Sequence, residues 1–132
     1  SAPDVVRRVQ RLIVQPNRQL AELRAWAHGA GLWLVDENIE QQRGRFFVSC
    51  AFATGSGPDP AYVESALALE HAFELGPWLV RRRVPDAAEY YARERTRLAS
   101  LMASGRSEYA AQHAAFAAGC RLFATEDADV SG

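Results

Sequence analysis

The sequence predicts an α/β fold, in which part of a mainly parallel sheet ends in an antiparallel β-hairpin and a C-terminal α-helical hairpin follows. Three observations predict it. A strand, an amphipathic helix and a second strand follow one another at the start of the chain. Only a short turn then joins the second strand to a third. After residue 84 the apolar residues recur with a helical period.

The first strand is expected at residues 9–14 and leads directly into a polar turn, Gln15-Pro16-Asn17. Its unbroken apolar run, Leu12-Ile13-Val14, is typical of a strand that is buried on both faces in a parallel sheet. Pro16 lacks a backbone donor and ends the strand, and Asn17 is a good N-cap for a helix. In open α/β sheets this carboxyl end of a strand is where ligands bind.

The first helix is expected at residues 18–28, with Leu20, Leu23 and Ala27 on its apolar side. Gly29 and Gly31 end it, and a second strand runs from Trp33 to about residue 39. A right-handed crossover from the first strand to a parallel neighbour is therefore expected.

A turn at residues 41–44 leads to a third strand at 45–53, which is rich in aromatic residues. The turn is too short for a parallel crossover, so the second and third strands must form an antiparallel hairpin. A short helix is expected at about 61–73, and Leu75-Gly76-Pro77 ends it.

The C-terminal part predicts two helices with a break at Ser104-Gly105. Apolar residues of the second helix are spaced four, three, four and three apart, which is a heptad seam made by Tyr109, His113, Phe116, Cys120 and Phe123. Residues of the first helix face that seam: Val84, Ala88, Tyr91, Leu98 and Leu101 or Met102. We expect a sheet domain at 1–76, a helical hairpin or coiled coil at 77–123 and a disordered tail at 124–132.

Composition limits the classes of function. The 132 residues are 48% hydrophobic, and the net charge of −1 predicts no strong general attraction to nucleic acid or membrane. Cys50, Cys120 and the three His residues lack metal-ligand spacing, so no metal is expected. A reduced, cytoplasmic setting is the plain interpretation, and no stretch is long and apolar enough for a membrane span.

Four blocks of residues resemble the bacterial tRNA (adenine-22-N1)-methyltransferase family. They are residues 11–17 (RLIVQPN), 23–26 (LRAW), Trp33 with 35–37 (VDE), and Gly76-Pro77, and the match covers roughly 7–103. The resemblance implies part of a class-I methyltransferase (Rossmann-like) sheet followed by a helical coiled-coil extension. It also implies S-adenosylmethionine as the cofactor and tRNA as the substrate.

Only the second half of such an enzyme is matched. The family's glycine-rich cofactor loop, its acidic ribose-binding residue and its Gly-Met-Gly-Gly segment do not occur in the chain. The chain also has Phe47-Val48 where the family tends to have Tyr-Glu. The main cofactor-binding residues are therefore expected in an upstream half, and the chain alone is expected to be inactive.

The resemblance implies that Gln15 and Asn17 face the cofactor or the target adenine, beside Pro16. Their amides both donate and accept hydrogen bonds, and methylation at N1 requires the adenine to be held in position more than it requires a strong base. The structural alternative is that Asn17 is only a helix cap and that Gln15 is a surface residue.

A second expected site is a basic face of the helical part. Residues 77–123 contain eight Arg against four acids, and such a face could bind tRNA phosphates through Arg81, Arg82, Arg83, Arg93 and Arg97. A solvated helix surface with paired charges explains the same pattern. Trp26, Trp33, Trp78, Tyr90 and Tyr91 are expected in the core rather than as platforms for stacked bases.

Three hypotheses about function remain open from the sequence. The chain is the C-terminal part of a tRNA adenine N1-methyltransferase-like protein, or a non-catalytic relative that binds RNA or a protein. The third is a structural role through a homodimer. This third hypothesis follows from the expectation that the half-sheet exposes an edge beside its first strand, which a missing segment or another copy must cover.

Overall fold

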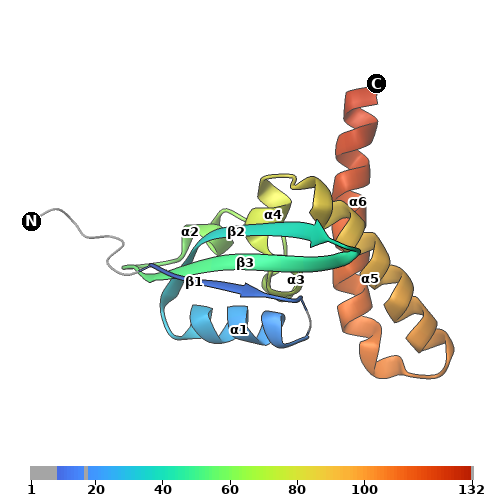
Figure 1. Cartoon of the computed structure of the whole chain (residues 1–132), viewed down its shortest axis with the longest axis horizontal. Coiled ribbons are helices and arrows are strands. Elements are labelled where there is room, and N and C mark those ends of the chain that lie inside the picture. The colour runs from blue at the N-terminus through green and yellow to red at the C-terminus, as the bar shows by residue number, and fades with distance from the viewer. Residues whose placement is uncertain (1–8, 17, 132) are drawn as a thin grey trace, which may run out of the picture.

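The computed structural model describes the backbone of residues 9–16 and 18–131 and the side chains of 9–16 and 19–124. Figure 1 shows a small sheet beside a set of helices, of which the two longest lie at one end of the sheet. In chain order the elements are β1 (Val9–Val14), α1 (Arg18–Gly29), β2 (Leu32–Gln42), β3 (Arg45–Thr54), α2 (Pro60–Val63), α3 (Leu69–Leu75), α4 (Pro77–Arg81), α5 (Pro85–Ala103), the 3₁₀ helix η1 (Ser107–Tyr109) and α6 (Ala110–Ser131).

The sheet has the order β1-β3-β2, and both outer strands are antiparallel to β3. β1 and β2 therefore point the same way, but β2 is not the neighbour of β1. The expectation of a crossover to an adjacent parallel strand, and with it a mainly parallel sheet, is wrong for the residues that the structure describes. The reason is that the hairpin turn folds β3 back into the space between β1 and β2, where Val14 pairs with Val48.

The predicted hairpin is confirmed, and its turn explains the register. Arg43 and Gly44 have φ angles of 53° and 78°, so both turn residues are left-handed, as in a two-residue type I′ turn. Such a turn matches the twist of the strands that it joins, and it pairs Gln42 with Arg45. The ladder then continues to Leu32 and Thr54, so β2 is longer than the predicted strand.

A bulge in β2 decides which of its side chains are buried. The register shifts between Leu34 and Asp36, and the residues on either side of the shift, Leu34, Glu37 and Ile39, are all at most 2% exposed. They face the same side as Phe46, Val48, Cys50 and Phe52 of β3, which form the hydrophobic core together with the helices. The opposite side of the sheet carries exposed polar residues such as Asn38 and Glu40.

β1 is not buried on both faces, contrary to the expectation from its apolar run. Val9, Leu12 and Ile13 are 52%, 41% and 71% exposed. β1 is the last strand of the sheet in the described part of the chain, so nothing covers its outer edge there. The apolar pattern that predicts burial is present, and the structure leaves it exposed to solvent.

The helices pack on the core side of the sheet and on one another. Figure 1 shows α2, α3 and α4 behind the three strands and the two long helices α5 and α6 side by side. The rings of Tyr91 and Phe116 lie 6.0 Å apart between α5 and α6. At Gly119 a Cβ atom would lie 2.9 Å from the Tyr91 ring and 3.0 Å from Leu75, so this glycine permits close approach of α6 to α3 and α5.

Two helix boundaries differ from the prediction. The single helix expected at 61–73 is two helices, α2 and α3, separated by residues 64–68. The helix α6 extends to Ser131 and so overlaps the predicted disordered tail at 124–132. No helix in the described residues is both long enough and apolar enough to cross a membrane.

Candidate functional site

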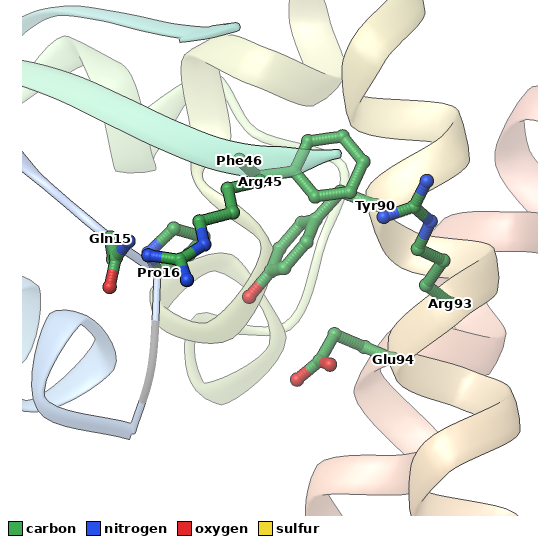
Figure 2. Close-up of a pocket in the computed structure, with 7 residues that line it drawn as sticks. All are labelled: Gln15, Pro16, Arg45, Phe46, Tyr90, Arg93 and Glu94. Atoms are coloured by element: carbon green, nitrogen blue, oxygen red, sulfur yellow. The ribbon is translucent and has the colours of Figure 1, made fainter. Parts of the chain in front are cut away.

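A pocket of about 520 Å³ lies at the carboxyl end of β1, where the polar turn begins. Figure 2 shows it between the end of β1 and the helix α5, with side chains from three elements directed toward it. Its lining residues are Gln15, Pro16, Arg45, Phe46, Tyr90, Arg93 and Glu94.

The sheet register and the helix period bring these residues together. Val14 pairs with Val48 in the antiparallel ladder, so the start of β3 lies beside the residues that follow β1. This places Arg45 and Phe46 next to Gln15 and Pro16. Tyr90, Arg93 and Glu94 are spaced three and four residues apart on α5, so they share one face of that helix.

Tyr90 is the polar group of the pocket that is most deeply buried. It is 8% exposed, and its ring packs 5.4 Å from that of Phe46 and 5.6 Å from that of Phe116. Its hydroxyl points into the pocket. Burial raises the pKa of Tyr90 above its ordinary value, so the hydroxyl stays protonated at neutral pH and can donate to a ligand.

The charged side chains of the pocket differ in the number of protein groups that they already bind. Arg93 donates to the Gly44 carbonyl at 2.9 Å, pairs with Glu89 at 3.0 Å and lies over the Phe46 ring. Glu94 accepts two hydrogen bonds from Arg97, at 2.9 and 3.0 Å. Arg45 is exposed and forms no ion pair within the described part of the chain, so its guanidinium can bind an anion.

The pocket therefore combines an amide, a phenolic hydroxyl, a carboxylate and a guanidinium around apolar surfaces. Such a set can hold a flat polar ligand that carries a negative charge. It contains no activated nucleophile. Cys50 is fully buried in the core, and burial raises the pKa of its thiol to about 11, so the thiolate is scarce at neutral pH. No group of residues that could bind a metal occurs in the described part of the structure.

The structure places three of the predicted site residues in this pocket: Gln15, Pro16 and Arg93. Asn17 lies outside the described residues. Arg97 does not line the pocket, but it holds the carboxylate of Glu94, which does. The roles predicted for these residues stay predictions.

Arg81, Arg82 and Arg83 lie elsewhere, at the end of α4. Arg81 donates to the carbonyls of Pro60 and Ala61 at 3.2 and 3.0 Å and pairs with Glu64 at 3.3 Å. The other two are also in contact with protein groups: Arg82 binds Asp36, and the guanidinium of Arg83 lies 5.5 Å from the centre of the Phe123 ring. These three residues therefore hold parts of the fold together, and any phosphate contact would compete with those partners.

One aromatic residue expected in the core is at the surface. Trp26 is 64% exposed on α1, so that prediction is wrong, whereas Tyr90 and Tyr91 are buried as expected. Trp78 is half-buried, donates to the Leu34 carbonyl at 2.7 Å and has the guanidinium groups of Arg81 and Arg82 over its ring.

Four pocket residues were missed from the sequence: Arg45, Phe46, Tyr90 and Glu94. The position of β3 beside β1 brings the first two into the pocket, and the sequence predicted a different neighbour for β1. Tyr90 and Glu94 carry a local signal, because their spacing of four places a hydroxyl and a carboxylate on one face of a predicted helix. That signal alone does not show which face meets the sheet.

Three of the blocks that carry the resemblance meet at a buried ion pair rather than at the pocket. Arg24 and Glu37 are each 1% exposed, and Nε of Arg24 lies 2.8 Å from a Glu37 oxygen. Gly76 has a φ of 89°, and a Cβ atom there would lie 2.8 Å from the Arg24 guanidinium. The other Glu37 oxygen accepts from the Trp78 backbone N–H at 3.1 Å. These blocks therefore have a structural role.

Comparisons with known proteins bear on the fold. No protein-family model and no curated protein sequence matches the chain. Among solved structures, the B. subtilis m1A22 tRNA methyltransferase TrmK superposes with a TM-score of 0.61 at 20% identity, over 88% of this chain and 50% of that one. The Streptococcus pneumoniae protein Sp1610, described as a putative tRNA (m1A22) methyltransferase in complex with S-adenosyl-L-methionine, gives 0.63 at 22% identity, over 84% and 47%. A protein of the NADB-Rossmann superfamily from Streptococcus agalactiae gives 0.55 at 18% identity, over 88% and 47%.

These likenesses confirm that the chain resembles part of the tRNA (adenine-22-N1)-methyltransferase structures, as the sequence blocks indicated. At identities near 20% they show the fold, which is α/β with a small three-stranded sheet. The chain spans about half the length of the solved structures that it matches.

Proposed function

We propose that the chain is the C-terminal part of a methyltransferase that transfers a methyl group from S-adenosylmethionine to an adenine of tRNA. The observation that carries the proposal is the pocket at the carboxyl end of β1. There the predicted residues Gln15 and Pro16 line the same pocket as Tyr90, in a fold like that of tRNA methyltransferases. An upstream half supplies the cofactor-binding residues, because this chain has no glycine-rich cofactor loop.

The role of the pocket in this reaction is to position the adenine. Gln15 and Tyr90 can each donate to or accept from a base edge, and Glu94 can accept from an exocyclic amine. Arg45 supplies a cation for a neighbouring phosphate. Adenine N1 is unprotonated at neutral pH, so holding the base in line with the methyl group accelerates the reaction without a strong base.

The test is methyl transfer to tRNA by the joined protein, which is this chain together with the reading frame upstream of Ser1. Tyr90→Phe and Gln15→Ala are each expected to lower kcat/KM about 10- to 100-fold, because each removes a contact that positions the base. The matched control is Gln112→Ala, which removes the same amide from α6, outside the pocket. Equal activity of Gln15→Ala, Tyr90→Phe and Gln112→Ala would rule out the pocket as the site of reaction.

A non-catalytic RNA-binding module is the second candidate. It is favoured by the absence from this chain of the cofactor loop and by the eight Arg against four acids in residues 77–123. This module would bind tRNA without S-adenosylmethionine, with an affinity that falls steeply as salt rises. Binding that needs the cofactor, or methylated product from the joined protein, decides for the enzyme.

A further inference from the structure

The turn between β2 and β3 carries a residue that its backbone geometry does not favour. Arg43 is the first of the two turn residues and has a φ of 53°. Turns of this type prefer Asn, Asp or Gly at that position, because most other side chains are strained in the left-handed region. Gly44 follows this preference at the second position, with a φ of 78°. A cation placed against the preference calls for a functional reason.

The turn is fixed to α5 by side chains of that helix. Arg93 donates to the Gly44 carbonyl at 2.9 Å. Asp86 accepts from the backbone N–H of Gln41 at 3.1 Å. With its amide oriented so that both of its polar groups are satisfied, Gln41 also donates to Glu89 at 3.0 Å and accepts from Arg93 at 2.7 Å. The turn therefore needs little ordering when a ligand binds to it.

Two exposed cations, Arg43 and Arg45, flank Gly44 on this turn. Among the side chains that the structure describes, 9–16 and 19–124, neither guanidinium forms an ion pair. The nearby acids of α5 already accept hydrogen bonds from Arg93, from Arg97 and from the backbone of β2. Both exposed cations therefore keep their hydrogen-bonding capacity for a ligand.

The turn lies at the edge of the 520 Å³ pocket. Arg45 lines this pocket beside Gln15 and Pro16, as Figure 2 shows. Arg43 lies two residues before Arg45, so their Cα atoms are at most about 7 Å apart. A nucleotide whose base enters the pocket therefore has its sugar and phosphate groups within reach of both arginines.

We infer that the turn between β2 and β3 is a phosphate clamp for RNA, in which Arg43 and Arg45 bind backbone phosphates next to the nucleotide whose base lies in the pocket. Guanidinium groups bind phosphate oxygens bidentately, and phosphate contacts set the position of a strand without reading its sequence. The clamp thus determines how the strand enters the pocket. The inference rests on the proposed function for the identity of the bound base as an adenine of tRNA.

The experiment measures the affinity of the joined protein for an unmodified tRNA transcript by fluorescence anisotropy, at about 50 to 200 mM salt and without methyl donor. Arg43→Asn is the decisive variant, because Asn suits the left-handed turn position and removes the cation. Its Tm is expected to be unchanged or raised. The slope of log affinity against log salt is expected to become less steep by about 0.7–0.9, the change for one lost phosphate contact, so the loss of affinity is about 3-fold greater at the lower salt.

Three further variants test whether the effect belongs to the clamp. Arg43→Lys keeps the charge and is expected to retain the slope of the unsubstituted protein. Arg45→Gln is expected to reduce the slope as Arg43→Asn does, and it repeats the test at a strand position should Arg43→Asn lower the Tm. Arg95→Asn is the matched control, because Arg95 is exposed on α5 and does not line the pocket. An unchanged slope in Arg43→Asn and Arg45→Gln, or an equal change in Arg95→Asn, would overturn the inference.

Binding and methyl transfer are measured on the same joined protein, so the two proposals fail separately. A salt dependence that Arg43→Asn reduces, in a protein that transfers no methyl group, refutes the proposed function alone. Methyl transfer by a protein whose salt dependence is the same with and without Arg43→Asn and Arg45→Gln refutes the clamp alone.

Discussion

Replacing Arg24 by Met is expected to destabilise the protein strongly, because it leaves a buried carboxylate without its charged partner. The substitution removes the 2.8 Å contact with Glu37 and the hydrogen bond to the Phe73 carbonyl at 2.7 Å. Among the described residues, the Glu37 carboxylate then keeps the backbone N–H of Trp78 as its hydrogen-bond donor. Removing one partner of a buried ion pair costs about 3–5 kcal/mol. For a chain of this size that corresponds to a fall in Tm of roughly 10–20 °C.

The assay is equilibrium unfolding in urea of the unmodified protein, Arg24→Met, Glu37→Met and the double variant, with unchanged m values as the condition for comparison. The double variant is expected to recover most of the loss, because an apolar pair of similar volume avoids the cost of two buried charges. Two results would show that the pair is not an isolated buried charge pair. One is a loss of unfolding free energy below about 1 kcal/mol in both single variants, and the other is a loss in the double variant equal to the sum of the two single losses.

Three further predictions concern other buried polar groups. Asp59→Ala is expected to cost about 2–4 kcal/mol in urea unfolding, because it removes the cap of α2 and leaves the Leu34 N–H unpaired; an unchanged free energy of unfolding would contradict a role in accepting hydrogen bonds. Burial raises the pKa of Cys50 to about 11, so the unfolded state loses the thiol proton at a lower pH than the folded state, and the free energy of unfolding is expected to fall as pH rises from about 9 to 11. A Cys50→Ala variant whose free energy of unfolding falls equally over this pH range would contradict this. Tyr91→Phe is expected to cost about 1–3 kcal/mol, because the Leu75 carbonyl loses a 2.6 Å hydrogen bond, and thermal unfolding would measure it; an unchanged Tm would refute it.

Local features of the fold were predictable because they depend on neighbours in the sequence. The bounds of β1 and α1 follow from an apolar run, Pro16 and the helical spacing of Leu20 and Leu23. The hairpin follows from a connection too short for anything else. The order of the strands was not predictable in this way, because it depends on where β3 returns after the turn, and periodicity carries no information about that choice.

The same limit applied to the pocket. Gln15 and Pro16 were found because they end a strand, which is a local signal. Arg45 and Phe46 reach the pocket only through the antiparallel pairing of β3 with β1, and Tyr90 and Glu94 only through the docking of α5. The burial predicted for β1 was wrong for a related reason. An apolar run indicates that a strand is suited to a buried position, but it does not show whether the chain contains the elements that would cover the strand.

The four blocks that resemble the methyltransferase family differ in what they indicate about function, because they lie in different parts of the structure. Arg24, Glu37 and Gly76 come from three blocks and meet at one buried ion pair, where charge pairing and a glycine with positive φ explain their identities without any ligand. Agreement at these positions therefore supports the fold. Gln15 and Pro16 have no comparable role in the core, and they line a pocket into which the hydroxyl of Tyr90 points. The proposal of methyl transfer thus depends on this one block, which is why Gln15→Ala in the joined protein separates a shared fold from a shared activity.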